Sequence, residues 1–337
     1  MSIPLQLPGL NSRRVLGLMS DAIDRCKLDL SGYVVFTEAA SGAYLTTPVL
    51  AAMAGADHVY ALTRSTRHGS VQDITASTLD LAELAGVRGR VEVITDKSQQ
   101  IVSKADIVTN SGHLRPIDSE MIAWMKPTAV IPLMYEDWEL RDGDIDLEAC
   151  RKHGIRVTGT NERHEAVDVF SFLGIMAVKL LLDSGVAVYS SRVLVLCDNP
   201  FGPYIERGLV SGGAVVERVN SLAEAREDAH YDAILLALTP TTRSAISEVH
   251  LSKIARHWPG AVVAVYWGDV DRSNLSSAGL SFWPPEAPAL GHMGILPSGV
   301  GPESIVRLQT GSLKAAEAML RYASIPDHPA HEFGQPL

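Results

Sequence analysis

Short apolar runs alternate with segments of helical periodicity along almost the whole chain, and this alternation predicts the elements of the fold. The strands predicted in the first half are Tyr33–Thr37, His58–Leu62, Val91–Thr95, Asp106–Asn110, Ala129–Leu133 and Arg156–Thr160. Those predicted in the second half are Arg192–Cys197, Ala214–Arg218, Asp232–Ala237, Val262–Tyr266 and Leu280–Trp283. Helical segments lie between most of them, for example Thr46–Ala54, Val71–Leu84 and Tyr204–Val210. Strands separated by helices need crossover connections, which predict parallel sheets with helices on both faces.

The two series of strands predict an α/β protein of two doubly wound, parallel-sheet (Rossmann-like) domains joined by a long buried helix. The joining segment is His164–Ser184, whose apolar residues nearly surround the helix axis, as is typical of a buried helix. We expect a first Rossmann-like domain at residues 1–163, for a substrate or a second nucleotide. We expect a second at residues 164–300, which binds the cofactor.

Residues 301–337 are predicted to form a C-terminal helix and tail that pack back across the domains. The helix is expected at Pro302–Tyr322, where apolar residues form one stripe. The tail Ile325–Leu337 is rich in Pro and His and is predicted to be loosely ordered.

Composition narrows the class of protein. Hydrophobic residues make up 46% and charged residues 20% of the chain, as in a packed globular protein. The net charge of −10 argues against nucleic acid or an anionic membrane as the main partner. The three cysteines, Cys26, Cys150 and Cys197, are far apart, so neither a disulfide framework nor a metal site is expected. The first residues show no secretory signal, and a cytoplasmic protein is expected.

The stretch from Glu286 to Gly294 places a carboxylate six residues before His292 in a loop rich in Pro and Gly. A Glu beside a His can fix the tautomer of the imidazole and tune its pKa for acid–base catalysis. A buried structural histidine is the competing interpretation. The position of the loop near the end of an α/β pattern favours a catalytic role for His292 and Glu286.

The second half begins with a strand followed by a tight turn, Asp198–Gly202, and the start of a helix. This geometry can place backbone N–H groups against a phosphate, so Asn199, Phe201 and Gly202 are candidate cofactor-binding residues. The glycine fingerprint of dinucleotide sites is reduced to Gly202. The turn therefore holds a dinucleotide in an altered pose, a smaller ligand or none.

From about Asp106 to Tyr322 the chain resembles the D-isomer-specific 2-hydroxyacid dehydrogenase superfamily. The resemblance rests on the following segments: Asp144–Ala149, Gly154–Thr160, Glu165–Asp168, Leu238–Arg243, Leu251–Gly268 with Val270, Asp271 and Leu275, Trp283–Glu286 and His292–Gly294. It implies two Rossmann-like domains, a homodimer, and an NAD(P)-dependent enzyme that acts on a carbonyl or alcohol of a small polar substrate.

The same resemblance implies roles for individual residues. His292 would be the acid/base, with Glu286 as its orienting partner. The cofactor, NAD or NADP, would be contacted by Asn199, Phe201, Gly202, Thr239, Pro240 and Gly268, and the substrate by His113, Arg115, Glu136 and Tyr266. The chain departs from the family at the arginine that grips the substrate carboxylate, which falls on Tyr266 or Trp267. An ordinary 2-hydroxy acid is therefore not the expected substrate.

Two alternatives stay open. The first half resembles a nucleotide-binding domain itself, because Thr37–Tyr44 follows one strand and opens a helix, and Arg64–Arg67 follows the next strand. Arginines there would suit the 2′-phosphate of NADP. A transferase that uses S-adenosylmethionine on this domain is the runner-up function, although no acid ends the strand at Leu62. The third possibility is a non-catalytic relative that kept the fold and lost the site.

Overall fold

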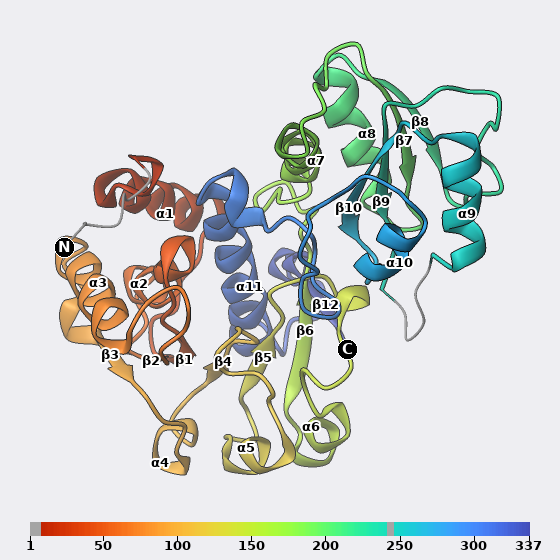
Figure 1. Cartoon of the computed structure of the whole chain (residues 1–337). Helices are drawn as coiled ribbons and strands as arrows, with labels where there is room; N and C mark the ends of the chain where they lie inside the picture. The colour runs from red at the N-terminus through yellow and green to blue at the C-terminus, as the bar shows by residue number, and fades with distance from the viewer. Residues whose placement is uncertain (1–7, 241–245) are drawn as a thin grey trace. The chain divides into compact units, whose positions relative to one another are not determined.

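The computed structural model describes residues 8–240 and 246–337, which form two compact units (Figure 1). Of the described residues, unit 1 contains 8–169 and 301–337, and unit 2 contains 170–240 and 246–300. Each unit is a parallel sheet with helices between its strands, so the predicted fold class of two doubly wound α/β domains is confirmed. The chain leaves unit 1 six residues after the predicted boundary, and residues 301–337 belong to unit 1.

Unit 1 is built on a sheet of seven strands within the described residues, in the order β12-β6-β5-β4-β1-β2-β3. Its parallel strands are β1 (Val34–Glu38), β2 (His58–Leu62), β3 (Val91–Ile94), β4 (Ile107–Val108), β5 (Val130–Pro132) and β6 (Arg156–Thr160). All six lie where the apolar runs predict them. The chain builds outward from β1 through β2 and β3, and then returns to add β4, β5 and β6 on the other side.

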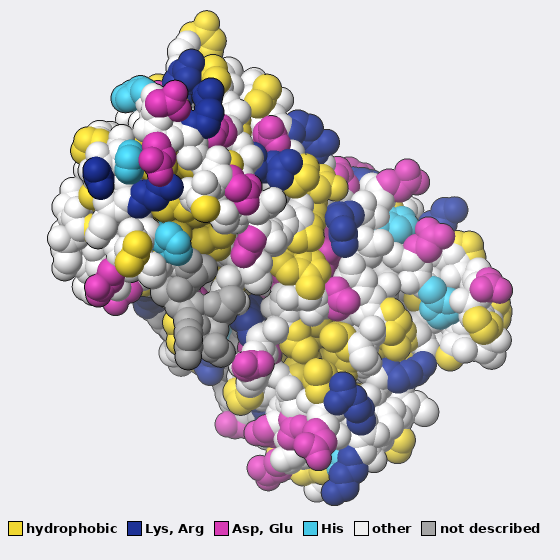
Figure 2. All heavy atoms as spheres, turned by 90° about the vertical axis from the view of Figure 1, so that its right-hand side faces the viewer, with side chains coloured by type: hydrophobic (Ala, Val, Ile, Leu, Met, Phe, Trp, Pro, Cys, Tyr) yellow, Lys and Arg dark blue, Asp and Glu magenta, His cyan; other side chains and the backbone are white. Residues whose placement is uncertain are grey.

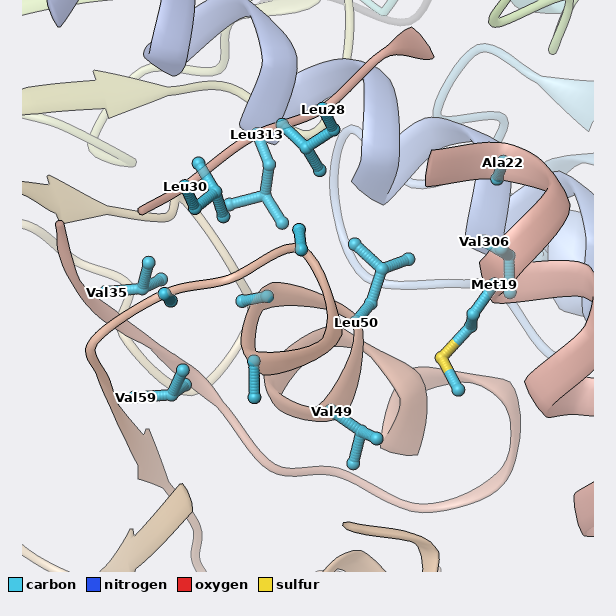
Figure 3. Close-up of a cluster of buried hydrophobic side chains, with 14 of the residues drawn as sticks. Met19, Ala22, Leu28, Leu30, Val35, Val49, Leu50, Val59, Val306 and Leu313 are labelled. Atoms are coloured by element: carbon cyan, nitrogen blue, oxygen red, sulfur yellow. The ribbon is translucent and has the colours of Figure 1, made fainter. Parts of the chain in front are cut away.

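The helices of unit 1 alternate with these strands. They are α1 (Ser12–Cys26), α2 (Thr46–Met53), α3 (Val71–Leu84), α4 (Gln99–Val102), α5 (Ser119–Trp124), α6 (Leu147–His153) and α11 (Glu303–Arg321), with short 3-10 turns at Pro8–Leu10, Gly42–Leu45, Arg88–Arg90 and Asp137–Glu139. Figure 3 shows Val306 and Leu313 of α11 beside Met19 and Ala22 of α1 and Leu50 of α2. The C-terminal helix thus completes the core of unit 1.

The predicted looseness of the tail is wrong. Residues Pro329–Phe333 form a 3-10 turn and Gly334–Pro336 form β12, which pairs antiparallel with β6. Phe333 is buried and its ring stacks on His164 at a centroid distance of 3.8 Å. Burial of Phe333 and pairing along β6 order the segment, and neither effect shows in its Pro- and His-rich composition.

Unit 2 is built on a sheet of five strands within the described residues, in the order β11-β10-β9-β7-β8. The strands, all parallel, are β7 (Arg192–Leu196), β8 (Val215–Val219), β9 (Ala233–Ala237), β10 (Val262–Trp267) and β11 (Phe282–Trp283). The helices are α7 (Ser171–Asp183), α8 (Gly202–Ser211), α9 (Glu248–His257) and α10 (Arg272–Ser277), and a 3-10 turn covers Pro297–Val300. The strand order reverses between β7 and β9, because the chain leaves β7 toward β8 and leaves β9 toward β10, in opposite directions along the sheet.

The helix predicted at His164–Ser184 is shorter and less buried than expected. It starts at Ser171, because the preceding residues turn at Asp168, whose φ of 49° is left-handed. Ile175 and Leu182 are more than half exposed, so the helix is not buried on every face. Its other side packs against α8 through Gly174, where a Cβ would stand 2.7 Å from Gly208 Cα.

The surface carries both signs of charge. Figure 2 shows acidic and basic side chains intermingled on the face that it presents. Among the described residues, no helix has the length and hydropathy needed to cross a bilayer.

Candidate active site

A pocket of about 410 Å³ opens in unit 2 at the carboxyl end of β10. Its wall includes Trp267, Gly268, Asp269, Arg272, Leu290 and His292. This volume is typical of sites for small molecules. Two residues that the sequence assigns to different roles, Gly268 for the cofactor and His292 for catalysis, therefore line one cavity.

Three hydrogen bonds join the loop that carries His292 to the end of β10. The Gly291 N–H donates to Asp269 Oδ1 at 2.8 Å, and Trp267 Nε1 donates to the Gly291 carbonyl at 3.0 Å. The Gly294 N–H donates to the Tyr266 carbonyl at 2.8 Å. A Cβ on Gly294 would stand 2.0 Å from the Val265 carbonyl oxygen, so only glycine allows this approach.

His292 and Glu286 occupy the same loop but are not joined as predicted. His292 is half-buried on the pocket wall, and its backbone N–H donates to the Ala289 carbonyl at 2.9 Å. Glu286 is exposed, and its carboxylate has no hydrogen bond or ion pair among the described residues. The neighbouring Pro285 and Ala287 line the pocket. The structure thus places His292 at a cavity without showing an orienting contact from Glu286.

Tyr266 does not line the pocket, which contradicts its predicted contact with substrate. Val265 and Trp267 line the pocket, and Tyr266 lies between them along β10, where the pairing with β9 is irregular. The side chain is fully buried, and its hydroxyl donates to the Leu173 carbonyl of α7 at 3.3 Å. Of the two positions on which the arginine of the resembled family falls, Tyr266 is therefore a buried structural side chain, and Trp267 lines the pocket.

Arg272 is a cation on the pocket wall that sequence reasoning missed. Its Nε donates to the Pro284 carbonyl at 3.0 Å and its Nη1 to the Val270 carbonyl at 2.7 Å. Its Nη2 is buried and has no hydrogen-bond partner among the described residues. Burial lowers the pKa of the Arg272 guanidinium. In the sequence, Arg272 follows Val270 and Asp271 at the start of α10, and no motif there indicates a role in binding.

The turn Asp198–Gly202 fits a dinucleotide only in part. Asp198 Oδ1 accepts from the backbone N–H and the hydroxyl of Thr239, at 2.8 and 3.0 Å. The Asp198 carboxylate therefore links the segment after β7 to the segment after β9. Asn199 bridges the same ends, because its Nδ2 donates to the Ala237 carbonyl at 2.8 Å. Phe201 is buried and stacks on Trp267. The turn is closed by its own side chains where a fingerprint of glycines would leave backbone N–H groups open to pyrophosphate.

The remaining predicted cofactor contacts lie around that turn. Gly202 begins α8, and a Cβ there would stand 3.0 Å from Arg218 Cδ. Gly268 adopts a φ of 122° beside Leu238, which only glycine tolerates. Thr239 and Pro240 follow β9, while the rest of that predicted loop, residues 241–245, lies outside the described residues.

In unit 1, Arg115 is engaged and His113 is held in place. Arg115 Nη1 pairs with Asp144 Oδ2 at 3.1 Å, and Tyr135 donates its hydroxyl proton to the same oxygen at 2.6 Å. The backbone N–H of His113 donates to Glu38 Oε2 at 2.9 Å, and the ring Nδ1 of His113 accepts from Arg64 Nε at 3.1 Å. Burial lowers the pKa of His113 against the opposing charge of Glu38.

Glu136 is sealed inside unit 1, which contradicts its predicted contact with substrate. It is fully buried, accepts from Trp138 Nε1 at 2.7 Å and pairs with Arg163 Nε at 3.0 Å. Burial, together with the charge of Glu136, raises the pKa of Glu139 to about 8. These contacts make Glu136 the centre of a structural charge cluster. Among the residues that the structure describes, no trio of His, Cys, Asp or Glu is placed to hold a metal ion.

No protein-family model matches the chain, and no curated protein matches it by sequence. Solved structures match it by fold. A dipicolinate synthase from Bacillus subtilis aligns with a TM-score of 0.55 and 13% identity, over 88% of this chain and 99% of that one. A dipicolinate synthase from Bacillus halodurans gives 0.54 and 12%, over 88% and 100%. A D-lactate dehydrogenase from Treponema pallidum gives 0.50 and 15%, over 86% and 97%.

These structural similarities establish the fold, and the chemistry has to be inferred from the residues of the site. They extend over nearly the full length of each neighbour, so the two-unit architecture is shared as a whole. The expected resemblance to D-2-hydroxyacid dehydrogenases is therefore confirmed at the level of fold. At these identities, a shared fold does not carry a substrate or a catalytic residue from one protein to another.

Proposed function

We propose that this protein is an NAD(P)-dependent oxidoreductase acting on a carbonyl or alcohol of a small polar substrate. The observation that carries the proposal is the pocket of about 410 Å³ at the end of β10, which brings His292 beside Gly268 and Trp267. The neighbours of known structure add support, since one of them is a D-lactate dehydrogenase. The nicotinamide end of the cofactor would lie in this pocket, held by the backbone at Gly268.

His292 supplies the proton in this proposal. In the reduction, the carbonyl oxygen of the substrate accepts a proton from the His292 imidazolium as its carbon accepts a hydride, and the alcohol forms. In the oxidation, neutral His292 accepts the hydroxyl proton. The bound nicotinamide supplies or takes the hydride. Asp269 and Gly294 fix the loop, so the imidazole stays on the pocket wall while water is displaced.

The substrate of this proposal is polar and need not be a 2-oxo acid. The wall of the pocket contains Asp269, Asp271 and Arg272, so it offers one cation and two acceptors instead of a bidentate arginine. We therefore expect a hydroxylated ketone or aldehyde to be reduced faster than pyruvate.

The decisive test measures NADH and NADPH consumption with a panel of small ketones, aldehydes and 2-oxo acids. His292→Asn should lower turnover by roughly 10²–10⁴-fold, the usual contribution of general acid catalysis, while cofactor affinity stays nearly unchanged. His230→Asn is the matched control, because His230 is an exposed histidine of the same unit. Equal turnover of wild type and His292→Asn would overturn the assignment of His292.

The orienting role of Glu286 stays a prediction, and Glu286→Gln tests it. A loss of turnover close to that of His292→Asn would support the role. Turnover equal to that of the wild type would show that His292 acts without Glu286, as its exposed position suggests.

A thermal-shift screen with NADH, NADPH and S-adenosylmethionine tests the transferase alternative. Ligands that bind the native state raise the melting temperature by mass action. A shift with S-adenosylmethionine and none with either nicotinamide cofactor would contradict the oxidoreductase proposal. The structure places Arg64, and not an acid, after β2, which disfavours recognition of ribose hydroxyls by a carboxylate there.

A further inference from the structure

The strand order of unit 1 points to a second ligand site, separate from the pocket that carries the proposed function. With β12 set aside, the order β6-β5-β4-β1-β2-β3 is that of mononucleotide-binding Rossmann sheets. The order reverses at β1, which pairs with β2 on one side and β4 on the other. Ligands of such sheets bind at the carboxyl ends of the strands beside this reversal.

Side chains from these three strand ends meet at that edge. Glu38 is the last residue of β1, Arg64 follows β2, and His113 follows β4. His113 contacts both, because its backbone N–H donates to Glu38 Oε2 at 2.9 Å and its ring Nδ1 accepts from Arg64 Nε at 3.1 Å. The Arg64 guanidinium thus contacts the His113 imidazole, and the Glu38 carboxylate contacts the His113 backbone, at the position where the topology expects a ligand.

The same edge carries buried polar atoms without partners. Thr63 Oγ1, Asn110 Oδ1 and His113 Nε2 are buried and have no hydrogen-bond partner among the described residues. Thr63 and Asn110 are at least nine-tenths buried as whole residues. Because Nδ1 of His113 accepts from Arg64, its proton lies on Nε2, which is then an unused donor. Buried polar groups are rarely left unpaired, so this concentration indicates a missing hydrogen-bonding ligand.

Arg64 provides the cation for an anionic ligand. It is exposed, it forms no ion pair among the described residues, and its only assigned bond uses Nε, toward His113. Its terminal nitrogens can therefore face a phosphate. In mononucleotide-binding sheets the residue after the second strand meets the 2′ position of the ribose, and a cation there accommodates a 2′-phosphate.

The loops that continue from Glu38 and Arg64 along the chain form a pocket of their own. A pocket of about 380 Å³ opens between the loop after β1, at Ala40–Ala43, and the loop after β2, at His68–Gly69. Apolar Leu45, Ile74 and Leu81 form part of its wall. Gly42 on this wall has a φ of 65°, which favours glycine, and no atom lies within 4 Å of its Cβ position.

We propose that the carboxyl edge of β1, β2 and β4 in unit 1 binds a nucleoside that carries a 2′-phosphate, with Arg64 at the phosphate and Glu38 and His113 at the ribose. The site is independent of the pocket around His292, which belongs to unit 2. It therefore stands whether or not the oxidoreductase proposal holds.

Calorimetric titration of the full-length protein with adenosine 2′-phosphate, adenosine 5′-phosphate and adenosine tests the site. We expect saturable binding of the 2′-phosphate, at least tenfold tighter than binding of the 5′-phosphate. Arg64→Ala should weaken it at least tenfold. Arg88→Ala is the matched control, because Arg88 is also exposed but lies before β3, at the opposite edge of the sheet, and should bind like the wild type.

Three results would overturn the proposal. They are no saturable binding of the 2′-phosphate, equal binding by Arg64→Ala and the wild type, or inorganic phosphate binding as tightly as the nucleotide. His292→Asn separates the two proposals, since it should abolish carbonyl turnover and leave binding of adenosine 2′-phosphate within twofold. Loss of that binding in His292→Asn would place the ligand in unit 2 and contradict the inference.

Discussion

At the scale of single residues, close backbone approaches position the proposed catalytic loop. The sequence shows the glycines after His292 and at 268, but it does not show which neighbour each one faces. The structure shows that Gly294 lies against the Val265 carbonyl and that Gly268 turns beside Leu238. The sequence also does not show which face of β10 carries Tyr266, because a shift of one residue moves a strand residue from one face of the sheet to the other.

Gly294→Ala should therefore destabilise the protein by roughly 1–3 kcal/mol, because the Val265 carbonyl is backbone and cannot move aside. Turnover should fall as well, since the His292 loop is displaced. Gly260→Ala is the matched control in unit 2, as no atom lies within 4 Å of its Cβ position. Urea unfolding of both variants measures the effect, and equal midpoints would contradict the account.

The buried charge cluster of unit 1 predicts a pH dependence of stability. Burial and Glu136 raise the pKa of Glu139 to about 8, so the folded state binds a proton that the unfolded state releases near pH 4.5. Stability from this group is present at low pH and is lost as pH rises through about 8, with a slope of at most about 1.4 kcal/mol per pH unit.

Glu139→Gln should flatten that loss between pH 5 and 8, because the amide stays neutral and its oxygen can still accept from the Glu136 N–H. Glu120→Gln, at an exposed position of α5, is the control and should follow the wild type. The measurement is the free energy of unfolding against pH. Parallel curves for wild type and Glu139→Gln would show that Glu139 ionises without cost.

At the scale of elements, apolar periodicity located the strands, and the alternation of strands and helices gave the fold class. The β12 strand escaped prediction because its order comes from pairing with β6 and from a single buried ring, Phe333. The start of α7 was misplaced for a related reason. The residues before Ser171 are apolar, but Asp168 adopts a left-handed turn and pairs with Arg307 of α11. Such long-range contacts leave no local pattern.

The helices α7 and α8 approach each other at Gly174 and Gly208, so alanine should destabilise the protein at this crossing and stabilise it at an exposed glycine of another helix. Gly174→Ala should destabilise unit 2 by roughly 1–3 kcal/mol, since its Cβ would meet Gly208 Cα at 2.7 Å. Gly17→Ala, on the exposed face of α1, should stabilise by roughly 0.5–1 kcal/mol, because alanine loses less backbone entropy in a helix. Thermal unfolding of both variants checks the pair. A stabilised Gly174→Ala variant would contradict the packing.

At the scale of the whole molecule, the strand order of each unit reverses at one point, and ligands of such sheets bind beside this point. The two units carry different side chains there. Unit 2 closes its turn with Asp198 and Asn199 and opens a pocket at His292. Unit 1 gathers Glu38, Arg64 and His113. The sequence indicates features of nucleotide-binding sites in both halves. It could not rank them, because the closure of one turn and the unpaired atoms of the other edge arise from contacts between strands.

The central claim is that the nicotinamide cofactor binds in the pocket at the end of β10. Hydrogen–deuterium exchange with and without NADH tests it directly, because bound cofactor slows exchange of the backbone amides that it covers or rigidifies. We predict slowed exchange in residues 265–272 and 287–294, with His292→Asn protected like the wild type. Unchanged exchange in these two segments at saturating NADH would contradict the account.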